Sequence, residues 1–266
     1  MKKLKNISSS KLLIIFFALT YTLSWIGNLF ELHSILPPGP LIIAVILLGV
    51  TAGKPAVKDF LRRIVDWRVG FRWYAFVLLL PVALMSLAVG INILIGANFS
   101  SGFQTPEIGD VLVTFIFIML FIGLGEEPAW RGFALPRLMK NRSVLMASLL
   151  LGALHVVWHL PLLGLEYHWN NVLPWAITTI AYSVVAAWMY VHTKGNLLLP
   201  ILIHTSQNVM GAFVFSKAFN GSDVTSLWWL MATNWFLVAL FIVIKYGKNL
   251  GTKKLINSLT YAGQNS

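Results

Sequence analysis

Eight long apolar stretches determine what this chain can fold into. They run over residues 12–30, 36–53, 73–98, 109–127, 144–165, 171–191, 197–216 and 225–244. Each is close to the roughly 20 residues that an α-helix needs to cross the hydrocarbon core of a bilayer. Their apolar side chains are continuous, whereas the strands of a transmembrane β-barrel alternate. We therefore expect an all-α, polytopic transmembrane bundle of about eight spans, with residues 1–266 forming a single integral membrane domain.

The composition also indicates a membrane protein. Only 11% of the residues are charged and the mean hydropathy is +0.77, whereas soluble domains have about 25% charged residues. The absence of cysteine excludes disulfides, thiolate metal ligands and a cysteine nucleophile. The first apolar stretch follows a basic N-terminus, as in a signal peptide, but it is longer than the apolar core of one. We interpret it as an uncleaved first span.

The basic residues lie on alternate loops. Of the 20 Lys and Arg residues, only Lys217 lies outside the N-terminus, the C-terminal tail and the even-numbered loops. Cytoplasmic loops carry an excess of Lys and Arg, so this pattern predicts that both termini are cytoplasmic. The net charge of +11 is then a consequence of topology. We expect a multi-pass protein of the cell membrane, of bacterial plasma-membrane type, with the lipid bilayer rather than nucleic acid as its partner.

Two adjacent carboxylates, Glu126 and Glu127, end the fourth apolar stretch and are two of only nine acidic residues. An ionised group at the bilayer centre costs about 2.5–3.5 kcal/mol on insertion scales, which favours a functional site. Arg131 lies one helical turn after Glu127 and can pair with it. This arrangement suits a general base that activates water beside a carboxylate held by arginine. The alternative is a structural ion pair, and Pro128 either kinks the span or begins a new helix.

Two later spans each carry polar side chains four residues apart, and hence on one helix face. These pairs are His155 with His159, and His204 with Asn208. The first spacing resembles the zinc motif HExxH, but Val156 occupies the glutamate position, so that motif is absent. His159 is the better candidate for chemistry, and His155 either supports it or is structural. His204 could ligate a metal or polarise a carbonyl, with Asn208 helping to bind an oxyanion. The alternative is polar contact between helices.

Residue counting predicts that these groups can meet. Glu127 and His159 lie roughly 20–25 Å from the turn that joins their spans, at 1.5 Å per residue. His204 would lie shallower unless the fourth span continues as helix beyond the bilayer. Two other intramembrane protease designs are excluded, because the chain has no GxSG motif and no pair of aspartates within its spans.

Together these motifs resemble those of the CAAX protease and bacteriocin-processing family, also called CPBP or Abi. The motifs are EExxxR (Glu126, Glu127, Arg131), a histidine four residues after a usually aromatic position (His159), and HxxxN (His204, Asn208). The stretches GEEPAWRGFALPRL and WHLP are similar to those of bacterial members. The resemblance covers about residues 110–215, the expected catalytic core, and His155 occupies the position at which the family usually has Phe or Trp.

The resemblance implies a glutamate-dependent intramembrane endopeptidase. Glu126 and His159 would activate water, and His204 with Asn208 would bind the oxyanion. On a metalloprotease description, Glu126, His159 and His204 would instead hold a divalent metal such as zinc. Eukaryotic relatives trim prenylated proteins, but we expect a peptide or membrane-protein substrate here, such as a pheromone or bacteriocin, that enters from the cytoplasmic side.

Two other functions use the same polar residues. A non-proteolytic scaffold, receptor or bacteriocin self-immunity protein could retain the same polar core. A transporter could use carboxylates and histidines as a proton relay, but transporters usually show internal repeats, and this chain has none.

Overall fold

The computed structural model describes residues 7–27, 34–215 and 217–252. Within these residues the chain is helical, with no β-strand beyond one isolated bridge between Leu163 and Tyr167. The all-α prediction is therefore confirmed. The end of the first apolar stretch, residues 28–30, and the basic segments 1–6 and 253–266 lie outside the described part of the chain.

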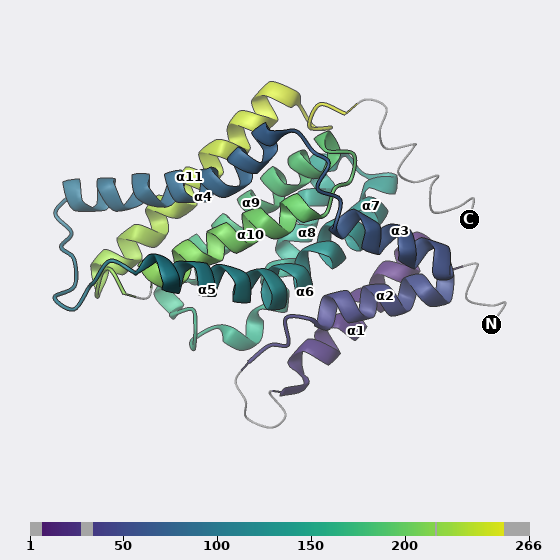
Figure 1. Ribbon diagram of the computed structural model, residues 1–266, viewed down its shortest axis with the longest axis horizontal. Helices are drawn as coiled ribbons and strands as arrows, with labels where there is room; N and C mark the ends of the chain where they lie inside the picture. The colour runs from purple at the N-terminus through teal and green to yellow at the C-terminus, as the bar shows by residue number, and fades with distance from the viewer. Residues whose placement is uncertain (1–6, 28–33, 216, 253–266) are drawn as a thin grey trace.

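Eight apolar helices correspond to the eight apolar stretches (Figure 1). Among the described residues, five helices are long enough to cross a membrane: α4 (Phe71–Leu94), the composite helix Ile108–Asn141, Trp169–His192, Leu198–Phe215 and α11 (Ser222–Tyr246). The third of these contains α9 (Val172–His192), and the fourth contains α10 (Leu198–Met210). Three are shorter: α1 (Ser9–Trp25), α2 (Gly39–Thr51) and α8 (Val144–Trp158). The prediction of about eight spans agrees with this set.

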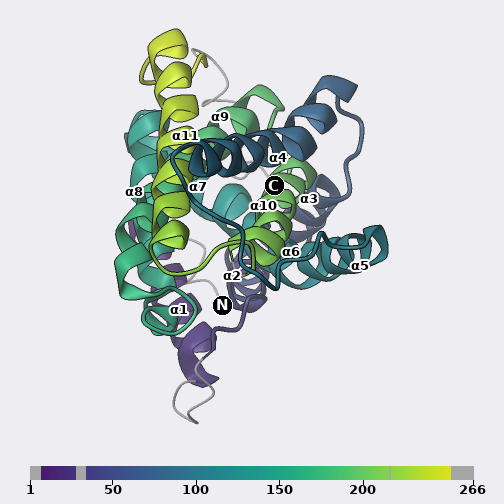
Figure 2. The same ribbon diagram turned by 90° about the vertical axis from the view of Figure 1, so that its left-hand side faces the viewer.

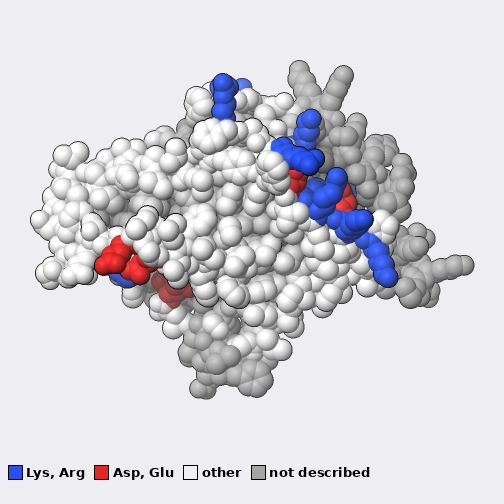
Figure 3. Space-filling view, viewed as in Figure 1, with Lys and Arg blue, Asp and Glu red and all other residues white. Residues whose placement is uncertain are grey.

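A short basic helix, α3 (Lys54–Ile64), was not predicted. It buries only Phe60 and Ile64 against the bundle and exposes its charged side chains. Figure 3 shows most of the visible Lys and Arg, with a few Asp and Glu among them, at the end of the molecule that contains α3, whereas the charged residues visible at the opposite end are mainly Asp and Glu. Most of the surface between these two ends is uncharged, as lipid contact requires.

The composite helix Ile108–Asn141 contains two π-helical segments. The π segments, Met119–Gly123 and Pro128–Ala134, lie on either side of α6 (Leu124–Glu127). The composite helix begins with α5 (Ile108–Ile118), and α7 (Leu135–Leu138) follows the second π segment. A proline inside an α-helix lacks one hydrogen-bond donor and clashes with the preceding turn. Here Pro128 is the first residue of the second π segment, so the helix continues through it. The fourth span thus extends as helix to Asn141, as residue counting required for His204.

Close packing around α6 depends on glycine. A Cβ atom on Gly125 would lie 2.6 Å from the backbone oxygen of Pro37, just before α2, and one on Gly123 would lie 3.1 Å from the oxygen of Ile201 on α10. The start of α2 and the middle of α10 therefore touch the composite helix directly.

Helix α9 lies between α8 and α11, and α10 packs against α4 and the first π segment. Figure 2 shows α8 and α11 on one side of the bundle and α5 on the other, where its apolar side chains are exposed. This arrangement surrounds the polar residues of α6 with α8, α9 and α10.

Candidate active site

Buried polar side chains from four neighbouring elements meet in the middle of the bundle. Glu126 and Glu127 come from α6, Arg131 from the following π segment, His155 from α8 and His204 from α10; all five are buried. The structure thus brings together residues that the sequence analysis assigned to three separate motifs.

Glu127 is a fully buried anion that joins three elements. Its Oε2 lies 3.1 Å from Nε of Arg131, and its Oε1 accepts hydrogen bonds from Nδ1 of His204 at 2.8 Å and from the Tyr182 hydroxyl at 3.1 Å. The Arg131 guanidinium also lies over the Tyr182 ring, 5.1 Å from its centroid. Glu127 is not among the described residues that line the large pocket beside the site, so its contacts hold other groups in place.

Glu126 faces a different environment. Its Oε2 accepts hydrogen bonds from Nε2 of His155 at 3.0 Å and from the Trp130 indole at 3.4 Å. Its Oε1 has no hydrogen-bond partner among the described residues, and the residue lines a large pocket. His155, which the sequence analysis left as supporting or structural, therefore contacts this carboxylate directly.

His159 caps the C-terminus of α8, where a 3₁₀ turn (Leu160–Leu162) begins. Its Nδ1 lies 3.0 Å from the carbonyl oxygen of His155. A carbonyl can only accept, so Nδ1 carries the proton, and Nε2 of the neutral ring has a free lone pair. The ring lines the pocket, with its centroid 4.9 Å from that of His155.

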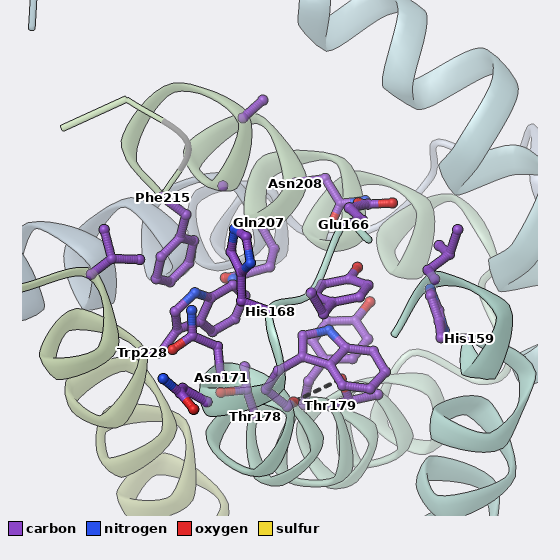
Figure 4. Close-up of a pocket in the computed structure, with 18 of the residues that line it drawn as sticks. His159, Glu166, His168, Asn171, Thr178, Thr179, Gln207, Asn208, Phe215 and Trp228 are labelled. Atoms are coloured by element: carbon purple, nitrogen blue, oxygen red, sulfur yellow. Dashed lines mark hydrogen bonds between the residues drawn. The ribbon is translucent and has the colours of Figure 1, made fainter. Parts of the chain in front are cut away.

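His204 and Asn208 lie one turn apart on α10, and both line the same pocket. The His204 ring centroid is 6.4 Å from that of His155. Figure 4 shows Asn208 and His159, from different helices, bordering one cavity. Every predicted catalytic residue except Glu127 and Arg131 therefore lines the pocket.

The pocket has a volume of about 1530 Å³ and an aromatic wall. Phe215 stacks on Trp228 at 3.9 Å between centroids, Tyr167 lies 4.4 Å from Trp175, and Trp175 lies 5.2 Å from His159. Figure 4 shows Phe215 and Trp228 on one side of the cavity and His159 on the other. A peptide segment could lie along this wall with one of its carbonyl groups beside Glu126.

The predicted metal ligands Glu126, His159 and His204 are each held by a hydrogen bond to a neighbouring residue, although Oε1 of Glu126 and Nε2 of His159 have no partner among the described residues. Among the residues that the structure describes, no group of three or more His, Asp or Glu side chains is placed to hold a metal ion. Catalytic zinc requires three protein ligands directed at one point. Here Glu126 is bonded to His155, and His204 to Glu127. As placed, these side chains do not converge on one point as the ligands of a zinc centre do.

Two contacting residues were missed by the sequence analysis. Tyr182 donates to Glu127, and Trp130 donates to Glu126. Trp130 could have been found from its spacing, because it lies one turn after Glu126 on the same face. Tyr182 is one of several residues with a hydroxyl group in α9, which is a weaker signal.

The geometry agrees with two comparisons. Residues 108–210 match the family model described as Type II CAAX prenyl endopeptidase Rce1-like. The chain is also 26% identical over 214 residues to CAAX prenyl protease 2 of Methanococcus maripaludis, covering 71% of this chain and 78% of that protein. The segment matched by the family model contains all six motif residues, from Glu126 to Asn208. These matches confirm the predicted resemblance: the chain has the apolar helices of a multi-pass membrane protein, and its sequence is similar to those of CAAX prenyl endopeptidases.

Proposed function

We propose that this protein is an intramembrane endopeptidase of the CAAX-protease type in which Glu126 activates water. One observation carries the proposal: of the two adjacent glutamates, Glu126 alone lines the 1530 Å³ pocket, and its Oε1 is free of protein hydrogen bonds among the described residues. The donors His155 and Trp130 fix the carboxylate, so Oε1 can accept a hydrogen bond from an attacking water. A general base must reach the proton that it removes at about 2.6–3.2 Å, directly or through one water.

His159 is the second acid–base group in this proposal. Glu126 removes one proton from the water as its oxygen attacks the peptide carbonyl, and delivers that proton to the leaving amine as the C–N bond breaks, which restores the carboxylate. The Nε2 lone pair of His159 accepts the second water proton from the carboxylic acid product and releases it to solvent, which completes hydrolysis. The bond from Nδ1 to the His155 carbonyl fixes the ring and its tautomer.

His204 and Asn208 would stabilise the oxyanion that forms on the carbonyl. Glu127 accepts from Nδ1 of His204, and a buried carboxylate in this position orients an imidazole and stabilises its protonated form. The Nε2–H of His204 and the Asn208 amide can then both donate to the oxyanion. Arg131 acts indirectly, by balancing the charge of Glu127.

For the substrate we propose a peptide or a membrane-associated protein. The matched protein is by name a prenyl protease, and the aromatic wall of this pocket has room for an apolar group on a peptide. The non-proteolytic scaffold is not favoured, because both matches are to proteases. We place the protein in the bacterial plasma membrane, in agreement with its alternating basic loops.

The test is Glu126→Gln in purified, reconstituted protein, assayed with a library of internally quenched peptides. Loss of general base catalysis should lower kcat by about 10²–10⁴-fold, while the melting temperature stays close to that of the unmodified protein. The matched control is Glu107→Gln, which removes an exposed carboxylate outside the pocket. Cleavage by the Glu126→Gln variant at the unmodified rate would contradict the assignment.

A further inference from the structure

The pocket leads from the buried site to one end of the bundle. At its inner end lie Glu126, His155 and His204, and its outer part is lined by connections between helices. These are residues 34–35 before α2, 168–171 before α9, and 219–222 before α11, together with the last residues of the α10 helix. Consecutive spans run in opposite directions, so these connections all lie at the same end of the bundle.

That end is opposite to the basic loops. Helix α3, with its Lys and Arg side chains, lies at the far end, where Figure 3 shows most of the visible Lys and Arg. The excess of Lys and Arg marks the cytoplasmic side of a membrane protein. The mouth of the pocket therefore opens on the non-cytoplasmic face. The predicted cytoplasmic route does not agree with this position, because the connections that line the pocket lie at the end opposite the basic loops.

The mouth has features that recognise a cation. None of the described residues that line the pocket is Lys or Arg, and its carboxylates are Glu126 at the inner end and Glu166 at the mouth. Glu166 interacts with the adjacent Tyr167 hydroxyl and has no ion-pair partner among the described residues. Partial burial against the pocket wall, and then the nearby negative charge of Glu126, raise the pKa of the Glu166 carboxyl. A cation bound beside Glu166 would stabilise its ionised form, and so would oppose the rise in pKa that burial and the charge of Glu126 cause.

Aromatic rings beside Glu166 add to this environment. The adjacent Tyr167 ring lies 4.4 Å from that of Trp175 and 6.3 Å from that of Trp228, measured between centroids. Ammonium and guanidinium groups bind favourably over the faces of such rings. A Lys or Arg side chain entering the mouth would thus meet a carboxylate and several aromatic rings before the substrate backbone reaches Glu126.

We propose that the pocket takes peptides from the non-cytoplasmic face and that Glu166 selects those carrying a Lys or Arg side chain at the mouth. This inference rests on the proposed function for the fate of the peptide. Its two parts, the side of entry and the preference for a cation, are measured below without any cleavage assay.

The side of entry can be tested by cysteine labelling, because the chain has no native cysteine. Asn170→Cys places a thiol at the exposed mouth, and Arg142→Cys places one in the exposed turn between α7 and α8 at the basic end. In spheroplasts, a membrane-impermeant maleimide should label the Asn170→Cys protein. The Arg142→Cys protein should be labelled only after permeabilisation. The reverse pattern would overturn the proposal, whether or not the protein is a protease.

The cation preference can be tested by binding. The Glu126→Gln protein, reconstituted in liposomes, is titrated with two fluorescent peptides that differ only by Lys or Gln at one position, with the position scanned along the peptide. At one position we expect the Lys peptide to bind about tenfold more tightly, as expected for a hydrogen bond to a charged group. Adding Glu166→Gln should abolish this difference, and adding Asp59→Asn, which removes an exposed carboxylate from α3 at the opposite end, should leave it unchanged. Equal binding of both peptides at every position would overturn the cation preference.

Discussion

Adjacent residues on the composite helix have different roles because a helix turns by about 100° at each residue. Glu126 points to the pocket and is held by two N–H donors, whereas Glu127 points into the bundle and meets a charged arginine. Arg131 is fully buried, and its two terminal nitrogens have no hydrogen-bond partner among the described residues. Its charge is therefore balanced by Glu127 and by the face of the Tyr182 ring.

This difference predicts that Glu127→Gln is far more destabilising than Glu126→Gln. Removing one partner of a buried ion pair typically costs about 3–5 kcal/mol, because the other charge is left uncompensated. We expect a clearly lower melting temperature in detergent for Glu127→Gln and for Arg131→Met alone. The double variant Glu127→Gln/Arg131→Met should recover much of the loss, since no unpaired charge remains. Additive losses in this double-mutant cycle would show that the two side chains do not stabilise each other.

The sequence could predict the catalytic candidates but not their partners. The motif residues stand out because polar groups in apolar spans are costly and few, so Glu126, His159 and His204 could be found by composition and spacing. Which group each one contacts depends on the rotation of α8, α9 and α10 about their axes. Local spacing does not determine that rotation. The contacts of His155 with Glu126 and of Tyr182 with Glu127 appear only in the folded bundle.

At the level of elements, the spans were predictable and the helical register within them was not. The apolar stretches predict membrane-crossing helices because their length matches the hydrocarbon core. The two π segments beside α6 depend on how Pro128 and the neighbouring helices pack. Helix α8 also ends at Trp158, before its apolar stretch does, because His159 caps it and a 3₁₀ turn with Pro161 follows. Such π segments are frequent at functional sites.

The close approach of α2 to α6 predicts the effect of a single methyl group. Replacing glycine by alanine inside a helix usually gains about 0.8–1.0 kcal/mol. At Gly125, however, the new Cβ would lie 2.6 Å from the Pro37 backbone oxygen. We expect Gly125→Ala to lower the melting temperature and to reduce activity, since α6 carries Glu126.

The matched control for this substitution is Gly90→Ala. Gly90 lies inside α4, and no heavy atom lies within 4 Å of the position of its added Cβ. It should keep or raise the melting temperature and leave activity unchanged. If Gly125→Ala proved as stable and active as Gly90→Ala, the packing of the α2 start against α6 would not be as described.

At the scale of the whole molecule, the basic loops and the mouth of the pocket lie at opposite ends of the bundle. Alternating basic loops predicted the orientation of the spans, but the sequence did not indicate at which end the cavity opens. That depends on how the connection 159–171 folds beside the ends of α10 and α11. At the mouth end the described charged residues are mainly acidic, with Glu107, Asp110, Glu166 and Asp223 against Lys217. The net field there is negative and favours the approach of cationic peptides.

This field predicts a dependence on salt that differs between substrates. The Debye length falls from about 30 Å at 0.01 M salt to about 3 Å at 1 M, so attraction from carboxylates around the mouth is screened. We expect kcat/KM for a Lys-containing peptide to fall at least about tenfold over this range in reconstituted protein, because steering raises association rates by about 10–10³-fold. A peptide with Gln in place of Lys should change little. An equal response of the two peptides would show that the charge at the mouth does not guide substrate, since only the Lys peptide carries the cation whose attraction to the mouth salt would screen.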